Sequence, residues 1–204
     1  MSEQLTSNLN RIESLKKEVR ANLRAQLQSV SAVQRQQMSS DAARQLAATP
    51  EFVSARTIMI FLSLSDEIDT SAIALKAWQN SKTVVAPRMD WECNRMIPVE
   101  ITSLQKNMFE VTQFNVLEPV GGDPVLLKDI DLILVPGLGF TNDGNRLGRG
   151  RGIYDRFLSQ PDMRAITCGL AMELQVLETL PVLDHDAPLS MLVTNRNVRR
   201  FSRK

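Results

Sequence analysis

The sequence is poor in cysteine, histidine and long apolar runs, and each scarcity removes a class of protein. The 204 residues include two cysteines, Cys93 and Cys168, and one histidine, His185. Two separated cysteines exclude a disulfide framework and a thiolate zinc cluster, and a lone histidine argues against a histidine-based triad or multi-histidine metal site. No segment approaches the roughly 18 apolar residues of a membrane span, and no apolar signal segment opens the chain. We therefore expect a cytoplasmic protein in a reducing compartment.

Net charge and length set further bounds. The formal charge of +1 gives no global attraction to nucleic acid or membrane, so any electrostatic function must come from local clusters. The length favours one domain over residues 1–204, with a core of about 11–195 and a basic, solvated tail over 196–204. We expect a monomer whose partners are small molecules.

An amphipathic helix is predicted near the N-terminus, over residues 11–30. Four apolar residues recur there every four positions: Leu15, Val19, Leu23 and Leu27. Three cations follow the same spacing: Lys16, Arg20 and Arg24. The apolar residues share one stripe of the helix, and the cations form a second stripe that faces solvent or an anionic ligand.

The rest of the chain alternates short apolar runs with helical segments, a pattern typical of an α/β fold. The runs expected as strands cover 57–63, 83–86, 96–101, 131–135, 165–170 and 191–194. Further helices are expected over 71–80 and from a cap at 39–41 to residue 48. The loop-rich segment 102–129 is suited to covering a cleft. We expect a mixed, mostly parallel sheet flanked by helices.

The residues with the clearest chemistry lie in 131–158, which predicts a strand, a long polar turn and a helix. In the turn, Gly148, Gly150 and Gly152 alternate with Arg149 and Arg151, so backbone amides can approach an anion beside guanidinium groups. The alternative is that the glycines only permit a tight turn and the arginines decorate it. Three arginines within six residues repel one another, which favours an anion among them. The turn from Arg146 to Tyr154 is therefore predicted to hold phosphate.

Carboxylates near this turn suggest a metal. Asp155 falls in the first turn of the expected helix, where an acid is favourable in any case. A carboxylate beside a phosphate site can also bind Mg²⁺, which prefers hard oxygen ligands. Asp143, Asp184 and Asp186 are further candidates, and the residues alone do not choose among them.

The stretch GNRLGRGRGIYDRFL, residues 144–158, resembles the signature of the 5-formyltetrahydrofolate cyclo-ligases, also called methenyltetrahydrofolate synthetases. KKEVR at 16–20, FLSLSDEIDT at 61–70 and LPVLDHDAP at 180–188 are similar to other segments of that family. The resemblance extends over about 16–194. It implies a single α/β domain and an enzyme that uses Mg-ATP to phosphorylate the formyl oxygen of 5-formyltetrahydrofolate. An internal nitrogen then attacks and phosphate leaves, giving 5,10-methenyltetrahydrofolate.

The resemblance also implies roles for the matching residues. The ATP-binding residues would be Lys16, Lys17, Glu18, Val19, Arg20, Arg146, Leu147, Gly148, Arg149, Gly150, Arg151, Gly152, Ile153 and Tyr154. The residues facing the folate would be Leu62, Glu67, Arg149, Gly150, Arg151, Gly152 and Ile153. Asp155 and Asp186 would hold Mg²⁺. The catalytic residues would be Arg149, Arg151 and Tyr154.

The sequence departs from the family pattern at several positions. Thr141 stands where the family usually has aspartate, Ile153 replaces the first tyrosine of the signature, and Arg151 and Ser190 replace other common residues. A second hypothesis is therefore a non-catalytic or altered-specificity paralogue that binds nucleotide or folate as a sensor or partner protein. A third is a nucleic-acid-binding module that uses the basic turn and tail.

Overall fold

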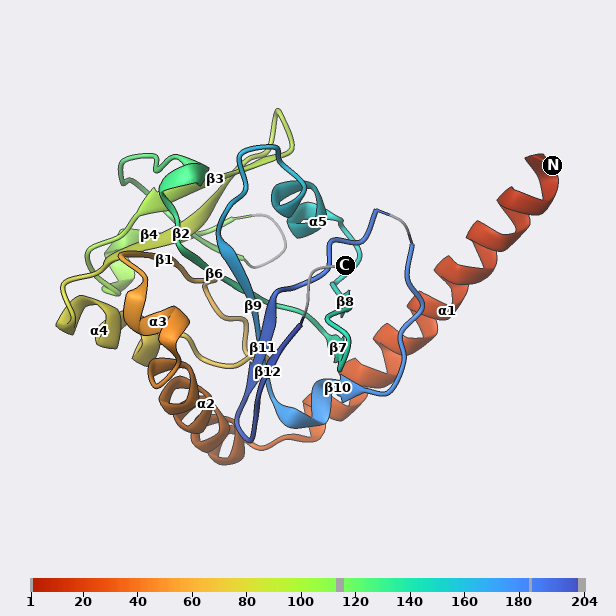
Figure 1. Cartoon of the computed structure of the whole chain (residues 1–204), viewed down its shortest axis with the longest axis horizontal. Helices are drawn as coiled ribbons and strands as arrows, with labels where there is room; N and C mark the ends of the chain where they lie inside the picture. Colours follow the sequence, from red (N-terminus) through yellow and green to blue (C-terminus); the bar gives the residue numbers. More distant parts are fainter. Residues whose placement is uncertain (1, 113–115, 184, 202–204) are drawn as a thin grey trace.

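A seven-stranded sheet forms the centre of the molecule, with helices on both faces (Figure 1). The computed structural model describes residues 2–112, 116–183 and 185–201, with side chains from residue 7 onward. In spatial order the strands are β3 (Arg95–Glu100), β2 (Thr83–Asp90), β1 (Thr57–Met59), β6 (Leu132–Val135), β9 (Ile166–Ala171), β11 (Met191–Thr194) and β12 (Val198–Arg200). Each predicted apolar run overlaps one of these strands.

The sheet is mixed and mostly parallel, as predicted. Strands β2, β1, β6, β9 and β11 run parallel, and the edge strands β3 and β12 are antiparallel to their neighbours. The run predicted over 57–63 pairs as a strand only as far as Met59. Beyond it the chain leaves the sheet, and the Thr70 hydroxyl donates to the Phe61 carbonyl oxygen at 2.7 Å. This departure opens space at the end of β1.

Alternate residues of the central strands pack into two separate hydrophobic cores, one on each face of the sheet. Ile58 and Val84 belong to the cluster that receives residues of the first four helices, whereas Met59 and Val85 belong to the cluster around α5. The five helices are α1 (Ser2–Ser29), α2 (Ala32–Ala47), α3 (Pro50–Ser54), α4 (Ser71–Gln79) and α5 (Ile153–Leu158). Neighbouring residues of a strand point to opposite faces, so this sheet is buried on both sides. Within the described part of the chain, no helix is long and apolar enough to cross a membrane.

The start of α2 was wrongly predicted. The helix begins at Ala32, because Ser31 forms a capping box with Gln34. The serines expected as caps lie inside the helix, where the hydroxyls of Ser39 and Ser40 donate to carbonyl oxygens four residues earlier. Serine hydroxyls satisfied in this way are tolerated within a helix.

Helix α1 carries the predicted stripe, with one correction. Its N-terminal half projects away from the rest of the molecule (Figure 1), while Leu23 and Leu27 are buried in the core. Leu15, predicted to be part of the stripe, is 43% exposed, whereas Lys16 is only 3% exposed. The buried face of α1 therefore changes from apolar to cationic toward the N-terminus.

The described part of the basic tail is more ordered than predicted. Val198–Arg200 is β12, which pairs antiparallel with β11. Arg199 forms an ion pair with Glu173 at 2.5 Å, and Arg200 pairs with Glu51 at 2.6 Å. These carboxylates lie far away in the sequence, so the local charge pattern did not reveal them. Residues 202–204 of the predicted tail lie outside the described residues.

Replacing Leu27 by alanine should lower the free energy of unfolding by about 2–5 kcal/mol, because it leaves a hole in a closely packed core. Leu15→Ala is the matched control in the same helix and should change stability by less than about 0.5 kcal/mol. Urea unfolding followed by circular dichroism measures both. Equal effects of the two substitutions would contradict the docking of α1.

Candidate functional site

A cavity of about 290 Å³ lies at the carboxyl ends of β1 and β6. The sheet continues from β1 through β2 in one direction and from β6 through β9 in the other. These two strands therefore flank the topological switch point, where open α/β sheets bind ligands. Phe61, Leu62 and Leu64 line the cavity after β1, and Pro136 and Gly137 line it after β6.

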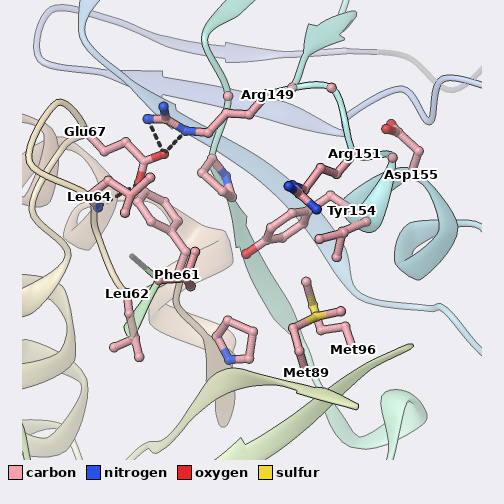
Figure 2. Close-up of a pocket in the computed structure, with 18 of the residues that line it drawn as sticks. Phe61, Leu62, Leu64, Glu67, Met89, Met96, Arg149, Arg151, Tyr154 and Asp155 are labelled. Carbon is pink, nitrogen blue, oxygen red and sulfur yellow. Dashed lines mark hydrogen bonds and ion pairs between the residues drawn. The ribbon is translucent and has the colours of Figure 1, made fainter. Parts of the chain in front are cut away.

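The cavity has an apolar part and a polar part (Figure 2). Its apolar lining comprises Phe61, Leu62, Leu64, Pro87, Met89, Trp91, Met96, Val116, Leu117 and Ile153. Its ionisable lining comprises Glu67, Glu118, Arg146, Arg149, Arg151, Tyr154 and Asp155. Part of the loop-rich segment 102–129 covers the cavity, because β5 (Leu117–Pro119), which pairs with β4 (Phe109–Val111), contributes to the wall. A flat, partly polar ligand suits such a lining.

Glu67 and Arg149 form the central ion pair of the polar wall. Arg149 Nε and Nη2 lie 3.1 and 3.0 Å from Glu67 Oε1, and Nη2 also lies 2.6 Å from Asp66 Oδ1. The Leu64 amide donates to Glu67 Oε2 at 3.0 Å. Burial raises the pKa of Glu67, against the opposing influence of the Arg149 guanidinium. The glutamate is thus held in one orientation, with its carboxylate at the cavity wall.

Tyr154 directs its ring into the cavity (Figure 2). Its hydroxyl oxygen is buried and has no hydrogen-bond partner among the described residues. Burial raises the pKa of this phenol, with a smaller contribution from Glu67, so the hydroxyl stays protonated at neutral pH. The Arg146 guanidinium lies over the ring, 5.7 Å from its centroid. A buried, unpaired donor inside a cavity is a polar contact that a ligand can satisfy.

The cationic face of α1 holds the glycine- and arginine-rich turn from outside. Arg20 Nε donates to the Gly148 carbonyl oxygen at 3.0 Å, and Arg24 Nη2 donates to that of Arg149 at 3.5 Å. Since C=O and N–H point in opposite directions across a planar trans peptide, the Arg149 and Gly150 amides point away from α1. Neither amide has an acceptor among the described residues. Two successive amides presented on one side are suited to binding an anion.

Two further ion pairs connect the predicted nucleotide-binding cations with the predicted metal ligands. Lys16 Nζ lies 2.5 Å from Asp186 Oδ2, and Arg146 Nη2 lies 2.7 Å from Asp155 Oδ1. Asp186 also accepts a hydrogen bond from the Leu183 amide at 2.7 Å. Within the described ranges, no three His, Cys, Asp or Glu residues are grouped closely enough to hold a metal. Asp184, another predicted candidate, lies outside those ranges.

The structure brings together part of the predicted site. Leu62, Glu67 and the stretch 148–155 line one cavity, whereas Lys16 and Asp186 meet outside its lining. The neighbours of Lys16 are less involved: Lys17 and Glu18 are exposed, and Val19 packs against the core.

Thr141 lies in β7 (Gly139–Thr141), which pairs with β8 (Arg146–Leu147) and β10 (Val176–Leu177), and it does not line the cavity. Its buried hydroxyl donates to Asp143 and accepts from the Asn145 amide at 3.1 Å. Thr141 therefore stabilises the turn between β7 and β8.

Several residues of the cavity or in contact with its lining were missed by sequence reasoning. Met89, Trp91 and Met96 come from the β2–β3 hairpin, Glu118 comes from β5, and Asp66 pairs with Arg149. Methionine and tryptophan in an apolar strand look like core residues. Asp66, next to Glu67, was the only one with a local signal.

The fold and the cavity define an α/β protein with a cavity at the switch point of its sheet. A family model described as the 5-formyltetrahydrofolate cyclo-ligase family matches residues 12–195. The chain belongs to this family. It is 33% identical to the 5-formyltetrahydrofolate cyclo-ligase of Mus musculus, over 86% of this chain and 91% of the relative. It is 27% identical to that of Escherichia coli K12, over 86% and 98%.

A solved structure gives the same result for the fold. The NMR structure of 5,10-methenyltetrahydrofolate synthetase from Aquifex aeolicus superposes with a TM-score of 0.81 at 30% identity. The match covers 93% of this chain and 94% of that one.

Tyr154 can be titrated without interference, because it is the only tyrosine in the chain. The folded protein should show little tyrosinate absorbance at about pH 10, where a free tyrosine is half ionised. A raised folded-state pKa contributes stability that is present below the unfolded pKa and is lost as pH rises above about 10. Ultraviolet difference spectra should therefore show ionisation only together with unfolding. Half-ionisation near pH 10 with the fold intact would contradict the buried hydroxyl.

Proposed function

We propose that this chain catalyses the ATP-dependent cyclisation of 5-formyltetrahydrofolate to 5,10-methenyltetrahydrofolate. The observation that carries the proposal is the cavity at the switch point, with the buried Glu67 carboxylate on one wall and the glycine- and arginine-rich turn on another. The names of the relatives support the same activity.

The apolar walls and Glu67 suit the pteridine end of a reduced folate. The ring is flat and carries N–H donors on its edge, so it can lie among Phe61, Leu62 and Met89 while its donors reach the glutamate. Arg149 keeps Glu67 oriented through its paired hydrogen bonds. Folate recognition by Leu62, Glu67 and residues 149–153 is thus part of the proposal.

The turn suits the phosphates of ATP, which the amides of Arg149 and Gly150 and the guanidinium of Arg151 would receive. In the reaction, the formyl oxygen forms a bond to the terminal phosphorus and ADP leaves. The N10 nitrogen then attacks the formyl carbon and gives up its proton, phosphate departs with the former formyl oxygen, and the methenyl bridge closes. Negative charge moves across the turn during both steps, and fixed amides and arginines stabilise it without reorganising.

Tyr154 would act as a hydrogen-bond donor. Its raised pKa makes it a poor base, and its unpaired hydroxyl lies inside the cavity. A donor at this place can bind the formyl oxygen and hold it toward the turn. The apolar walls keep water away from an activated formyl group that water would hydrolyse.

The described acidic residues alone do not form a complete Mg²⁺ site, so the ion would bind together with the nucleotide. Asp155 uses Oδ1 for Arg146, and no hydrogen bond from the described residues reaches its Oδ2. One or two carboxylates combined with phosphate oxygens and water are a usual magnesium environment. We therefore propose Asp155, with Asp186, as the ligands, and the ion would neutralise charge on the transferring phosphoryl group.

The ion pairs explain why ATP and Mg²⁺ would be needed together. Lys16 and Arg146 are 3% and 7% exposed, and each is neutralised by one of the proposed metal ligands. ATP alone would draw the cations away and leave carboxylates without partners. Mg²⁺ alone would leave buried cations unpaired, which is strongly unfavourable. Mg-ATP supplies both charges at once.

Two of the departures from the family pattern, Thr141 and Ile153, bear differently on the paralogue hypothesis. Thr141 is not part of the cavity, so its hydroxyl maintains a turn rather than touching a ligand. Ile153 does line the cavity and supplies an aliphatic wall. Ile153, like the cavity-lining Arg151, therefore offers a direct route to altered specificity. The nucleic-acid hypothesis is weakened, because Arg199 and Arg200 are already paired with glutamates.

We also propose that residues 1–204 work as a single domain, because both cores share one sheet. Two free cysteines suit the cytoplasm. The protein is further proposed to act as a monomer, in which one chain supplies both the apolar and the polar wall of the cavity.

Purified protein with ATP, Mg²⁺ and 5-formyltetrahydrofolate should produce the ultraviolet absorbance of the methenyl product. Omission of any one component should abolish the signal. The decisive second arm is the Thr141→Asp/Ile153→Tyr variant. A gain in kcat/KM of about tenfold or more, equal to about 1.4 kcal/mol, would favour a disabled paralogue. Absence of product in the wild type despite ATP binding would overturn the proposed activity.

Thermal unfolding should reveal the joint recognition of ATP and Mg²⁺. At a ligand concentration of about 100 Kd, Mg-ATP should stabilise the native state by about 2.7 kcal/mol and raise the Tm by about 5–10 °C. Each component alone should give much less. Lys16→Met should lose most of the shift, whereas Arg11→Met, an exposed cation of the same helix, should retain it. A full shift with Lys16→Met would contradict the assignment of Lys16.

A further inference from the structure

We propose that Glu118 is a positioning residue for the folate, because it fastens the β5 wall of the cavity to strand β2. The resemblance to the cyclo-ligase family assigned no role to Glu118. The inference rests on the proposed function insofar as the cavity is taken to hold the reduced folate.

Glu118 is a buried carboxylate that holds two segments together. It is 3% exposed, and its Oε2 accepts the Met89 amide hydrogen at 2.8 Å. Its Oε1 accepts from the Thr112 hydroxyl. Met89 lies in β2, and Thr112 lies just after β4. One side chain thus ties the β4–β5 ribbon to the central sheet.

Strand β2 needs this acceptor because β1 ends early. The β1–β2 pairing runs from Thr83 to Val85, and the Val85 carbonyl oxygen accepts the Ile60 amide as the last contact on that edge. Met89 is four residues further on, so its amide faces the same edge. Without Glu118, that N–H would be a donor with no acceptor beside the cavity. The carboxylate replaces the missing strand.

The two walls joined by Glu118 are the ones that would hold the pteridine. Met89 and Trp91 line the cavity from β2, and Val116 and Leu117 line it from the ribbon. The nucleotide side is formed by other elements, the 148–155 stretch and α1. Loss of Glu118 should therefore weaken folate binding while ATP binding remains.

Steady-state kinetics of Glu118→Ala test the inference. Loss of a hydrogen bond to a charged acceptor should raise the KM for 5-formyltetrahydrofolate about tenfold, with kcat within about twofold and the KM for ATP unchanged. Glu118→Gln should restore the wild-type KM, because its amide oxygen accepts from Met89 and the Thr112 hydroxyl can reverse its role. Thr112→Val should give a smaller increase, of about threefold. Glu110→Gln, an exposed glutamate opposite Glu118 in the ribbon, is the control and should match the wild type.

Hydrogen exchange of the Met89 amide supplies a readout that needs no turnover. The amide should be protected in the wild type and in Glu118→Gln, and should exchange rapidly in Glu118→Ala. An unchanged folate KM, or an equal loss of kcat and of both KM values, would overturn the positioning role. If the wild type turns over no folate, the proposed function fails, and the exchange rates still decide whether Glu118 fastens the wall. Should Glu118→Ala fail to fold, Thr112→Val decides, since wild-type KM and wild-type exchange in that variant would refute the inference.

Discussion

The docking of the cationic face of α1 against the glycine- and arginine-rich turn is the interaction on which the rest of the site depends. Arg20 and Arg24 hold the carbonyl oxygens of Gly148 and Arg149. The peptide planes are thereby fixed, and the opposite amides point away from α1. A glycine-rich turn has many accessible conformations of its own, and Gly150 has φ of +107°, which disfavours other residues. The helix therefore supplies the order that the turn lacks.

The charges of the site are balanced almost residue by residue. Lys16 and Arg149 pair with carboxylates that are distant in the sequence, and Arg146 pairs with Asp155, nine residues further on. Buried pairs of this kind add little net stability, because desolvation offsets their attraction. We propose that their consequence is selectivity. A ligand that carries only one sign of charge must leave a buried partner uncompensated, whereas a metal–nucleotide complex offers partners to both.

The sequence predicted the features that depend on residues close together in the chain. It did not predict the features that depend on contacts between residues far apart in the chain. Strand positions followed from apolar runs, and the turn was visible because its glycines and arginines are adjacent. The end of β1 at Met59 was not visible, since Ile60 and Phe61 are as apolar as the strand before them. The buried face of α1 is apolar at Leu23 but cationic at Lys16. Lys16 is buried because it pairs with Asp186, which is 170 residues away in the sequence. Periodicity reports which side of a helix is buried only where apolar contacts continue.

Ile153, which replaces a tyrosine of the family signature, changes the shape of the cavity wall more than the chemical groups of the site. It lines the cavity beside Tyr154, so an aliphatic side chain takes the place of a ring and a phenol in the wall. The hydroxyl that points into the cavity belongs to Tyr154, and the amides proposed to bind the phosphates are backbone groups. Neither depends on the side chain at position 153. The departure therefore reshapes the wall against which a folate is proposed to lie, but leaves in place the groups proposed to stabilise charge. Substrate preference is accordingly the property most exposed to this substitution.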